Sequence, residues 1–222
     1  LFYMSDQLIL KFPSSNAYLQ EDFYVSSSNK EAYDFVSSWP KWHKRIVNIF
    51  GPKRSGKTHI ASILRSKTST IEAETSQLDD KIFFKYKTKE ALIIENLNEK
   101  VSEELLFSIW NVALQDNKYL LITSYKPINS YRFILPDLKS RANSCITLGI
   151  KLPGDDLIGV ILAKNFSDKQ IKVEKKQIDY IIKRIDRSYE NISRFISILD
   201  KYSLKKGNPI NLKLIKEVLK MI

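Results

Sequence analysis

The sequence has little of several things, and each shortage excludes a class of protein. Its single cysteine, Cys145, cannot form a disulfide within the chain, which is typical of a reducing compartment, so we expect a cytoplasmic location. No apolar run approaches the roughly 18 residues that a membrane-spanning helix needs, and no secretory signal is recognisable, so no membrane partner is expected. The 222 residues suffice for one sizeable core and a small second domain.

The sequence also lacks any block of like charge, although 36 lysines and arginines against 25 acidic residues give a net charge of +11. One interpretation is an acidic partner such as nucleic acid. The alternative is a general richness in lysine, isoleucine, asparagine and serine, and the even spread of the basic residues favours it.

Strand and helix patterns alternate through the middle of the chain. A buried strand is predicted at 45–50, further strands at 91–96, 118–124 and 144–150, and helices at 57–66, 102–115 and 136–143. This alternation predicts an α/β fold, a mostly parallel sheet with helices on both faces. A preceding helix is predicted in "SSSNKEAYDFVSSW", where Ser28 and Glu31 have capping-box spacing.

The two ends of the chain differ from this middle part. Residues 1–20 contain "QLILKF" followed by turn-forming Pro13 and serines, which predicts an exposed tail. After residue 150 the apolar residues keep helical period, which predicts a small all-helical domain at 151–222 behind a core at 21–150.

The stretch "GPKRSGKT", Gly51 to Thr58, matches the phosphate-binding pattern G-x-x-x-x-G-K-[ST]. It lies between a predicted buried strand and an amphipathic helix, so backbone N–H groups and the helix N-terminus would face a phosphate. Lys57 would reach the β- and γ-phosphates, and the Thr58 hydroxyl would hold Mg²⁺. The predicted nucleotide contacts are Gly51, Pro52, Arg54, Ser55, Gly56, Lys57, Thr58 and His59.

Glu95 ends the apolar run "ALIIE", where such ATPases place an acidic magnesium ligand. We expect its strand to lie beside the strand that precedes Gly51, which would bring Glu95 close to Thr58. The alternative is a solvated glutamate at a strand end.

The motifs "GPKRSGKT", "IIENLN", "LLITSYKP", "LPDLKSRANS" and "IDYIIKRIDRSYENISRFISILDK" together resemble the AAA+ domain of the bacterial initiator DnaA. The order and spacing are similar over nearly the whole chain, most of all to the shorter DnaA-related regulators of the Hda type in their alphaproteobacterial form. The resemblance implies a P-loop AAA+ core followed by a helical lid, with ADP or ATP and Mg²⁺ as ligands.

The tail extends this resemblance. "QLILKF" is similar to the peptide with which Hda proteins bind the DNA sliding clamp, the β subunit of DNA polymerase III. Gln7 would then bond at the pocket rim while Leu8, Leu10 and Phe12 fill an apolar groove; the alternative is an N-terminal strand.

The resemblance assigns Arg141 in "LKSRANS" as an arginine finger that acts on nucleotide in a neighbouring subunit, although Arg141 could instead pair with Asp137 one turn earlier. Three positions depart from the initiator pattern. Asn96 stands where a second acid polarises the attacking water, and Tyr125 where an aspartate is usual. Glu190 aligns with an arginine of the lid, although Arg187 and Arg194, each one turn away, are alternatives for that position. These departures predict binding of nucleotide, mainly ADP, with weak or no turnover.

The expected function is regulation of replication initiation. The chain would dock on the sliding clamp, present Arg141 to ATP-loaded DnaA, and promote hydrolysis there, either alone or as a homo-oligomer. The alternative is an autonomous ATPase of the helicase-loader or initiator type acting on single-stranded DNA. Because the chain ends after the predicted lid, no sequence-specific DNA-reading domain is expected.

Overall fold

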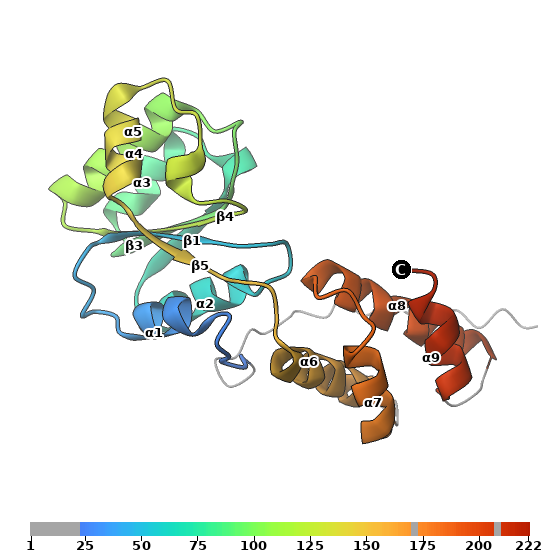
Figure 1. The fold of residues 1–222 in the computed structure, drawn as a ribbon. Helices are drawn as coiled ribbons and strands as arrows, with labels where there is room; N and C mark the ends of the chain where they lie inside the picture. Colours follow the sequence, from blue (N-terminus) through green and yellow to red (C-terminus); the bar gives the residue numbers. More distant parts are fainter. Residues whose placement is uncertain (1–22, 170–172, 207–209) are drawn as a thin grey trace, which may run out of the picture.

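The computed structural model describes residues 23–169, 173–206 and 210–222 (Figure 1). The predicted clamp-binding peptide, Gln7 to Phe12, lies outside the described residues.

The core of the chain is a five-stranded sheet in which every neighbouring pair of strands is parallel. The order across the sheet is β2-β3-β4-β1-β5. The predicted parallel sheet is therefore confirmed. The strands are β1 (Ile46–Phe50), β2 (Thr70–Glu74), β3 (Ala91–Leu97), β4 (Tyr119–Ser124) and β5 (Ile146–Gly149).

The prediction that β3, which carries Glu95, lies beside β1 was wrong. β4 lies between β3 and β1, pairing Ile94 with Ile122 on one side and Ile49 with Thr123 on the other. Both β3 and β4 are continuous apolar runs, so their composition indicates burial for each strand without deciding which of the two adjoins β1. Glu95 therefore reaches the phosphate loop across the end of β4.

Helices cover both faces of the sheet (Figure 1). α1 (Lys30–Ser37) and α2 (Lys57–Lys67) lie on one face, and α3 (Lys81–Lys87), α4 (Glu103–Gln115) and α5 (Pro136–Ser144) lie on the other. Successive residues of a strand point to opposite faces, and accordingly Ile93 packs in one apolar cluster while Leu92 and Ile94 pack in the other. This double burial explains the unbroken apolar runs in the sequence.

The predicted capping box before α1 is absent. α1 begins after Asn29, and no side chain caps its first turn. The hydroxyls of Ser28 and Ser26 are 2.7 Å apart and bond to each other, while Asn29 Oδ1 accepts from the Ser26 N–H. The segment before the helix thus forms a turn of its own, in which the Ser28 hydroxyl bonds to Ser26 and is not available to cap the helix.

The helices after β5 form a lid with its own apolar cluster. They are α6 (Asp155–Asp168), α7 (Lys175–Ile182), α8 (Tyr189–Lys206) and α9 (Leu212–Leu219). Phe195 and Ile181 are fully buried in this cluster, whereas Leu157 and Tyr189 pack into the core cluster that contains α1 and α2. None of the helices in the described part of the chain combines the length and apolar character needed to cross a membrane.

Candidate nucleotide-binding site

The loop between β1 and α2 requires glycine at two positions. A Cβ on Gly51 would lie 2.8 Å from the carbonyl oxygen of Ile150, so no larger residue fits without moving Ile150, which follows β5. Gly56 has φ +93°, and a Cβ there would lie 3.0 Å from the ring of Phe23. Both glycines therefore allow the tight turn that the sequence pattern predicts.

Lys57 lies at the start of α2 and is 8% exposed. Its ammonium donates to the carbonyl oxygens of Gly51 at 2.9 Å and Pro52 at 2.7 Å. Burial lowers the pKa of Lys57, and the nearby Glu95 carboxylate opposes this shift. The ammonium is thus held inside the loop, where it can exchange these carbonyl oxygens for phosphate oxygens.

Glu95 is 8% exposed and lies close to two hydroxyls. Thr123 Oγ1 donates to Glu95 Oε2 at 2.5 Å, and Thr58 Oγ1 lies 3.4 Å from the same oxygen. Burial is the main cause that raises the pKa of Glu95; the Thr123 bond opposes it, and repulsion from Glu74 and Glu72 adds to it. A carboxylate beside a hydroxyl is a hard-oxygen donor pair that fits Mg²⁺, and a cation there would offset these costs.

Asn96 follows Glu95 at a break in the strand ladder, where the pairing between β3 and β4 shifts register. Its φ of +56° lies in the left-handed region, which asparagine tolerates better than most residues. Asn96 Nδ2 donates to Glu74 on β2, at 3.2 and 3.1 Å from the two carboxylate oxygens. The Asn96 N–H donates to Thr123 Oγ1 at 3.0 Å.

Lys57, Thr58 and Asn96 line a cavity of about 580 Å³. One wall is the phosphate loop and the start of α2, and the other is formed by residues at the ends of β3 and β4, among them Asn96 and Tyr125. Six of the predicted nucleotide contacts line it: Arg54, Ser55, Gly56, Lys57, Thr58 and His59. The other two are Gly51 and Pro52, whose carbonyl oxygens accept hydrogen bonds from the Lys57 ammonium.

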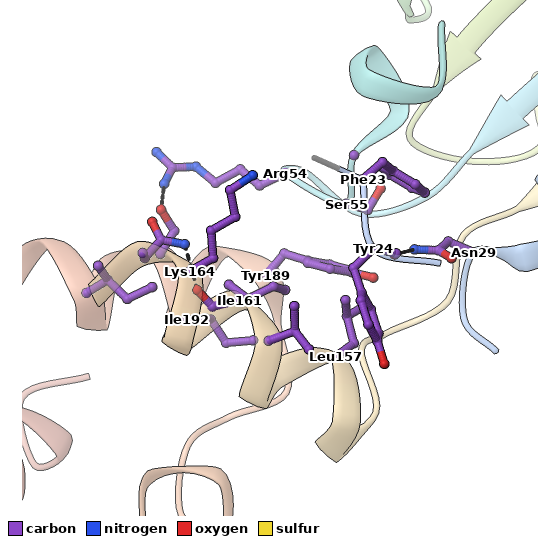
Figure 2. Close-up of a pocket in the computed structure, with 15 residues that line it drawn as sticks. Phe23, Tyr24, Asn29, Arg54, Ser55, Leu157, Ile161, Lys164, Tyr189 and Ile192 are labelled. Atoms are coloured by element: carbon purple, nitrogen blue, oxygen red, sulfur yellow. Dashed lines mark hydrogen bonds between the residues drawn. The ribbon is translucent and has the colours of Figure 1, made fainter. Parts of the chain in front are cut away.

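A second cavity, of about 280 Å³, adjoins the first (Figure 2). It shares the segment Arg54–Gly56 with the first, and its other walls come from the chain before α1 and from α6 and α8. Its lining is mainly apolar and includes Phe23, Tyr24, Leu157, Ile161, Tyr189 and Ile192. A flat aromatic group attached to a diphosphate would fit this pair of cavities.

The second cavity was not predicted from the sequence. Its lid residues keep helical period and were attributed to the lid core, while Phe23 and Tyr24 precede the predicted helix with no pattern of their own. The aromatic pair beside a phosphate-loop pattern is the signal that could have indicated it. Arg54 closes one side, with φ +63° and a hydrogen bond from its guanidinium to Ser193 on α8.

Glu190, in the first turn of α8, lines a third cavity of about 370 Å³ beside the phosphate loop. Pro52, Lys53 and Tyr125 line the same cavity. Since Lys53 and Tyr125 also line the phosphate cavity, the cavity that Glu190 lines adjoins the phosphate cavity.

Arg141 on α5 lines none of these three cavities. Its guanidinium lies 4.7 Å from the ring centroid of Phe107, and its buried Nη1 has no hydrogen-bond partner. No ion pair joins it to Asp137, although both residues are described, so the alternative pairing is absent. Arg141 is therefore a cation that makes no contribution to this chain's own nucleotide site.

No family model matches the sequence. Among curated proteins, the chain is similar to the chromosomal replication initiator protein DnaA of Campylobacter jejuni, at 28% identity over 227 residues, covering 90% of this chain and 51% of that protein. The chain thus spans about half the length of the curated relatives it matches.

Solved structures show the same fold. Domain III of Thermotoga maritima DnaA matches with a TM-score of 0.76 at 17% identity, over 94% of this chain and 98% of that one. AMPPCP-bound DnaA from Aquifex aeolicus matches with a TM-score of 0.67 at 18% identity, over 82% of this chain and 64% of that one. The chain is thus similar in sequence to DnaA and has the AAA+ P-loop fold of DnaA domain III.

Proposed function

We propose that this chain is an Hda-type regulator of replication initiation that binds ADP or ATP with Mg²⁺ and promotes ATP hydrolysis by DnaA. The observation that carries the proposal is that the nucleotide cavities and the arginine-finger candidate lie in different places on the chain. The chain has adjoining cavities for the phosphates and base of a nucleotide, whereas its finger candidate, Arg141, lies outside both. Such an arginine is suited to act on nucleotide held by another subunit.

The nucleotide site supports binding more than rapid turnover. Lys57, Thr58 and Glu95 form the phosphate and magnesium end, and the apolar cavity would receive the base. The neutral Asn96 lines the phosphate cavity, and Glu190 lines the cavity beside it, which we propose adjoins the terminal phosphate. A carboxylate facing a γ-phosphate repels it, so ADP is the preferred ligand.

Arg141 supports the action in trans. Its guanidinium lies over the ring of Phe107 and its Nη1 is buried, so the contact with a phosphate of a partner would fall to Nη2 or Nε. An arginine supplied in trans accelerates phosphoryl transfer by about 10³–10⁵-fold in other nucleotide hydrolases. The partner proposed here is ATP-loaded DnaA, and a homo-oligomer of this chain would place Arg141 in the same relation to a second copy.

The tail supplies the proposed link to replicating DNA. Gln7, Leu8, Leu10 and Phe12 have the residue types of a clamp-binding peptide, and an extended peptide of this kind gains affinity from alternate side chains in pockets. Docking on the sliding clamp would restrict the action on DnaA to the time after replication has begun, in the cytoplasm.

Calorimetric titration of the nucleotide-free protein with Mg²⁺–ADP and Mg²⁺–ATP tests the nucleotide preference. We expect ADP to bind at least tenfold more tightly, and Glu190→Gln to reduce the difference. Asp186→Asn, which removes an exposed charge four residues earlier, before α8, should leave the difference unchanged. Equal tight binding of both nucleotides, followed by rapid hydrolysis, would contradict the regulator.

A second assay tests the partner. Hydrolysis of ATP prebound to DnaA is followed with and without this chain on clamp-loaded DNA. Stimulation should be lost in Arg141→Ala and in a Gln7→Ala, Phe12→Ala double variant, and kept in Lys139→Ala, which removes an exposed cation of the same helix. Stimulation that survives Arg141→Ala would refute the finger assignment.

A second candidate function is an autonomous ATPase acting on single-stranded DNA. It is favoured by Phe84 on α3, which is 80% exposed between the exposed Lys81 and Lys85, because bases stack on aromatic side chains within basic surfaces. Salt-dependent binding of an oligonucleotide that weakens about tenfold in Phe84→Ala would support it. If no such binding is detected at 50 mM salt, the autonomous ATPase acting on single-stranded DNA is excluded and the regulator is the remaining candidate.

A further inference from the structure

The amino ends of the strands carry a row of basic residues. Because all neighbouring strands are parallel, their amino ends lie along one edge of the sheet, opposite the carboxyl ends where the phosphate loop begins. In Figure 1 this edge lies on the side of the core away from the lid. In the order β2-β3-β4-β1, the residues that precede the strands form what we call the cationic edge: Lys67, Lys87, Lys89, Lys118, Lys44 and Arg45.

The cationic edge has an excess of positive charge over a defined length. The loop segments 43–45, 67–69, 87–90 and 116–118 contain these six cations and two acids, Glu90 and Asp116, which leaves a net charge of +4 with His43 neutral. Neighbouring strands lie about 4.8 Å apart, so the row spans roughly 14 Å from β2 to β1. The basic residues are spread along the sequence, and the strand order gathers these six.

Four of the six cations also have a structural role. They donate to backbone carbonyl oxygens, as Lys118 does to that of Lys87 at 3.0 Å and Lys44 to that of Ser144 at 2.6 Å. Both acceptors lie in the last turns of helices, where cations offset the partial negative charge of the helix end. An ammonium has three donors, so each lysine keeps at least one for a further acceptor.

Lys87 and Lys89 have no such role. Among the described residues, no hydrogen bond or ion pair engages either ammonium, although both backbone carbonyls accept from Lys118. Lys87 is exposed and Lys89 is half-buried. The fold therefore does not need these two charges, and they are free to contact an anion outside the chain.

Aromatic rings support the edge from within. Tyr119, the first residue of β4, packs edge-to-face on Trp39 and Trp42, with ring centroids 5.9 and 5.6 Å apart. The guanidinium of Arg45 lies 4.9 Å from the centroid of the Tyr119 ring. Because these rings pack on one another, they hold the cations in place and offer no open face on which a base could stack.

This combination selects among polyanions. Single-stranded nucleic acid is bound by cations together with exposed aromatic faces, whereas in a duplex the bases already stack on each other. A lipid surface favours an amphipathic helix with an exposed apolar face, and the cationic edge consists of loops between helices and strands. A rigid row of cations without stacking faces fits the phosphate backbone of a duplex.

We propose that the cationic edge binds the backbone of duplex DNA without reading its sequence. The choice of DNA rests on the proposed function, in which the chain acts beside clamp-loaded DNA. One strand of a duplex carries a phosphate per about 3.4 Å of helix axis, so the roughly 14 Å edge faces about four phosphates. Since the edge is opposite the phosphate loop, bound DNA leaves the nucleotide cavities open.

Fluorescence anisotropy with a labelled duplex of about 30 base pairs and mixed sequence tests the proposal on the full chain, without clamp or DnaA. For about four neutralised phosphates, the logarithm of the association constant should fall with the logarithm of salt concentration at a slope of about −4. The double variant Lys87→Ala, Lys89→Ala should bind at least tenfold more weakly at 50 mM salt, with a slope shallower by about 2. Its urea midpoint should match the wild type, since neither ammonium is bonded in the fold.

The matched control is the double variant Lys175→Ala, Lys176→Ala, which removes two exposed lysines from the first turn of α7 and changes the net charge equally. Its affinity for the duplex should change less than twofold. An equal loss in both double variants would mean attraction by net charge alone and would overturn the proposal.

Three other outcomes would also overturn it. One is no binding of the duplex at 50 mM salt, and another is binding of polyglutamate but not of the duplex. The third is tighter binding of a single-stranded oligonucleotide that is lost in Phe84→Ala. Duplex binding that behaves as expected, in a chain that does not stimulate DnaA, would instead refute the proposed regulator and leave the cationic edge as a DNA contact.

Discussion

The substitution Asn48→Ala is expected to destabilise the protein strongly, although Asn48 has no part in any sequence motif. Asn48 lies on β1 and is fully buried. Its Nδ2 donates to Ile122 O at 3.0 Å and to Ser124 Oγ at 2.8 Å, and its Oδ1 accepts from the N–H of Ile128 at 2.9 Å. The side chain thus joins β1 to the end of β4 and to the following turn η3 (Ile128–Ser130).

The magnitude follows from what alanine leaves unpaired. The Ile128 N–H is buried and loses its acceptor, which costs about 1–3 kcal/mol, and each lost bond from Nδ2 adds about 1 kcal/mol. We expect a loss of about 3–5 kcal/mol in the free energy of unfolding. For a chain of this size that corresponds to a fall in Tm of about 8–15 °C.

Urea denaturation followed by circular dichroism measures this loss as a lower midpoint at an unchanged m-value. Asn143→Ala is the matched control, since Asn143 is exposed on α5 and a surface substitution changes stability by about 0.5 kcal/mol or less. A loss below about 1 kcal/mol in Asn48→Ala, with m unchanged, would refute the reasoning.

Three further predictions concern the site and the thiol. The pKa of Glu95 is raised in the folded protein, so the free energy of unfolding falls as the pH rises from the ordinary glutamate pKa to the pKa of the folded state. Glu95→Gln should therefore raise the urea midpoint at pH 7.5, and this gain should shrink near pH 4. The same substitution should weaken the binding of Mg²⁺–nucleotide. Gly56→Ala forces a left-handed residue with a Cβ against Phe23 and should cost about 1–3 kcal/mol and at least tenfold in ADP affinity, measured by denaturation and calorimetry. Burial raises the pKa of Cys145 to about 12, so a disulfide reagent at pH 8 should label it slowly in the folded protein and at once in urea; fast labelling of folded protein would contradict the structure.

Much of the fold follows from local patterns. The apolar runs of β1, β3, β4 and β5 predict strands, and the motif from Gly51 to Thr58 predicts a phosphate loop between a strand and a helix. β2 escaped prediction because Thr70–Glu74 is an edge strand with half-exposed residues and two glutamates. Charged residues of this kind protect sheet edges and weaken the strand pattern.

The residues that complete the site come from segments far apart in the chain. Lys57 and Thr58 were predictable because their roles depend on the short loop that contains them. The contact of Glu95 with Thr123, the pairing of Asn96 with Glu74, and the cavity between Phe23 and Ile192 depend on strand order and on how the lid packs.

The α/β class, the phosphate loop and the helical lid are predictable from the amino-acid order, because each depends on residue type at short, regular spacing. That β4 separates β3 from β1, and that Arg141 packs on Phe107, is seen only in the folded chain. Neighbours far apart in the chain are selected by the joint packing of both sheet faces, and similar apolar strands could satisfy that packing in more than one order.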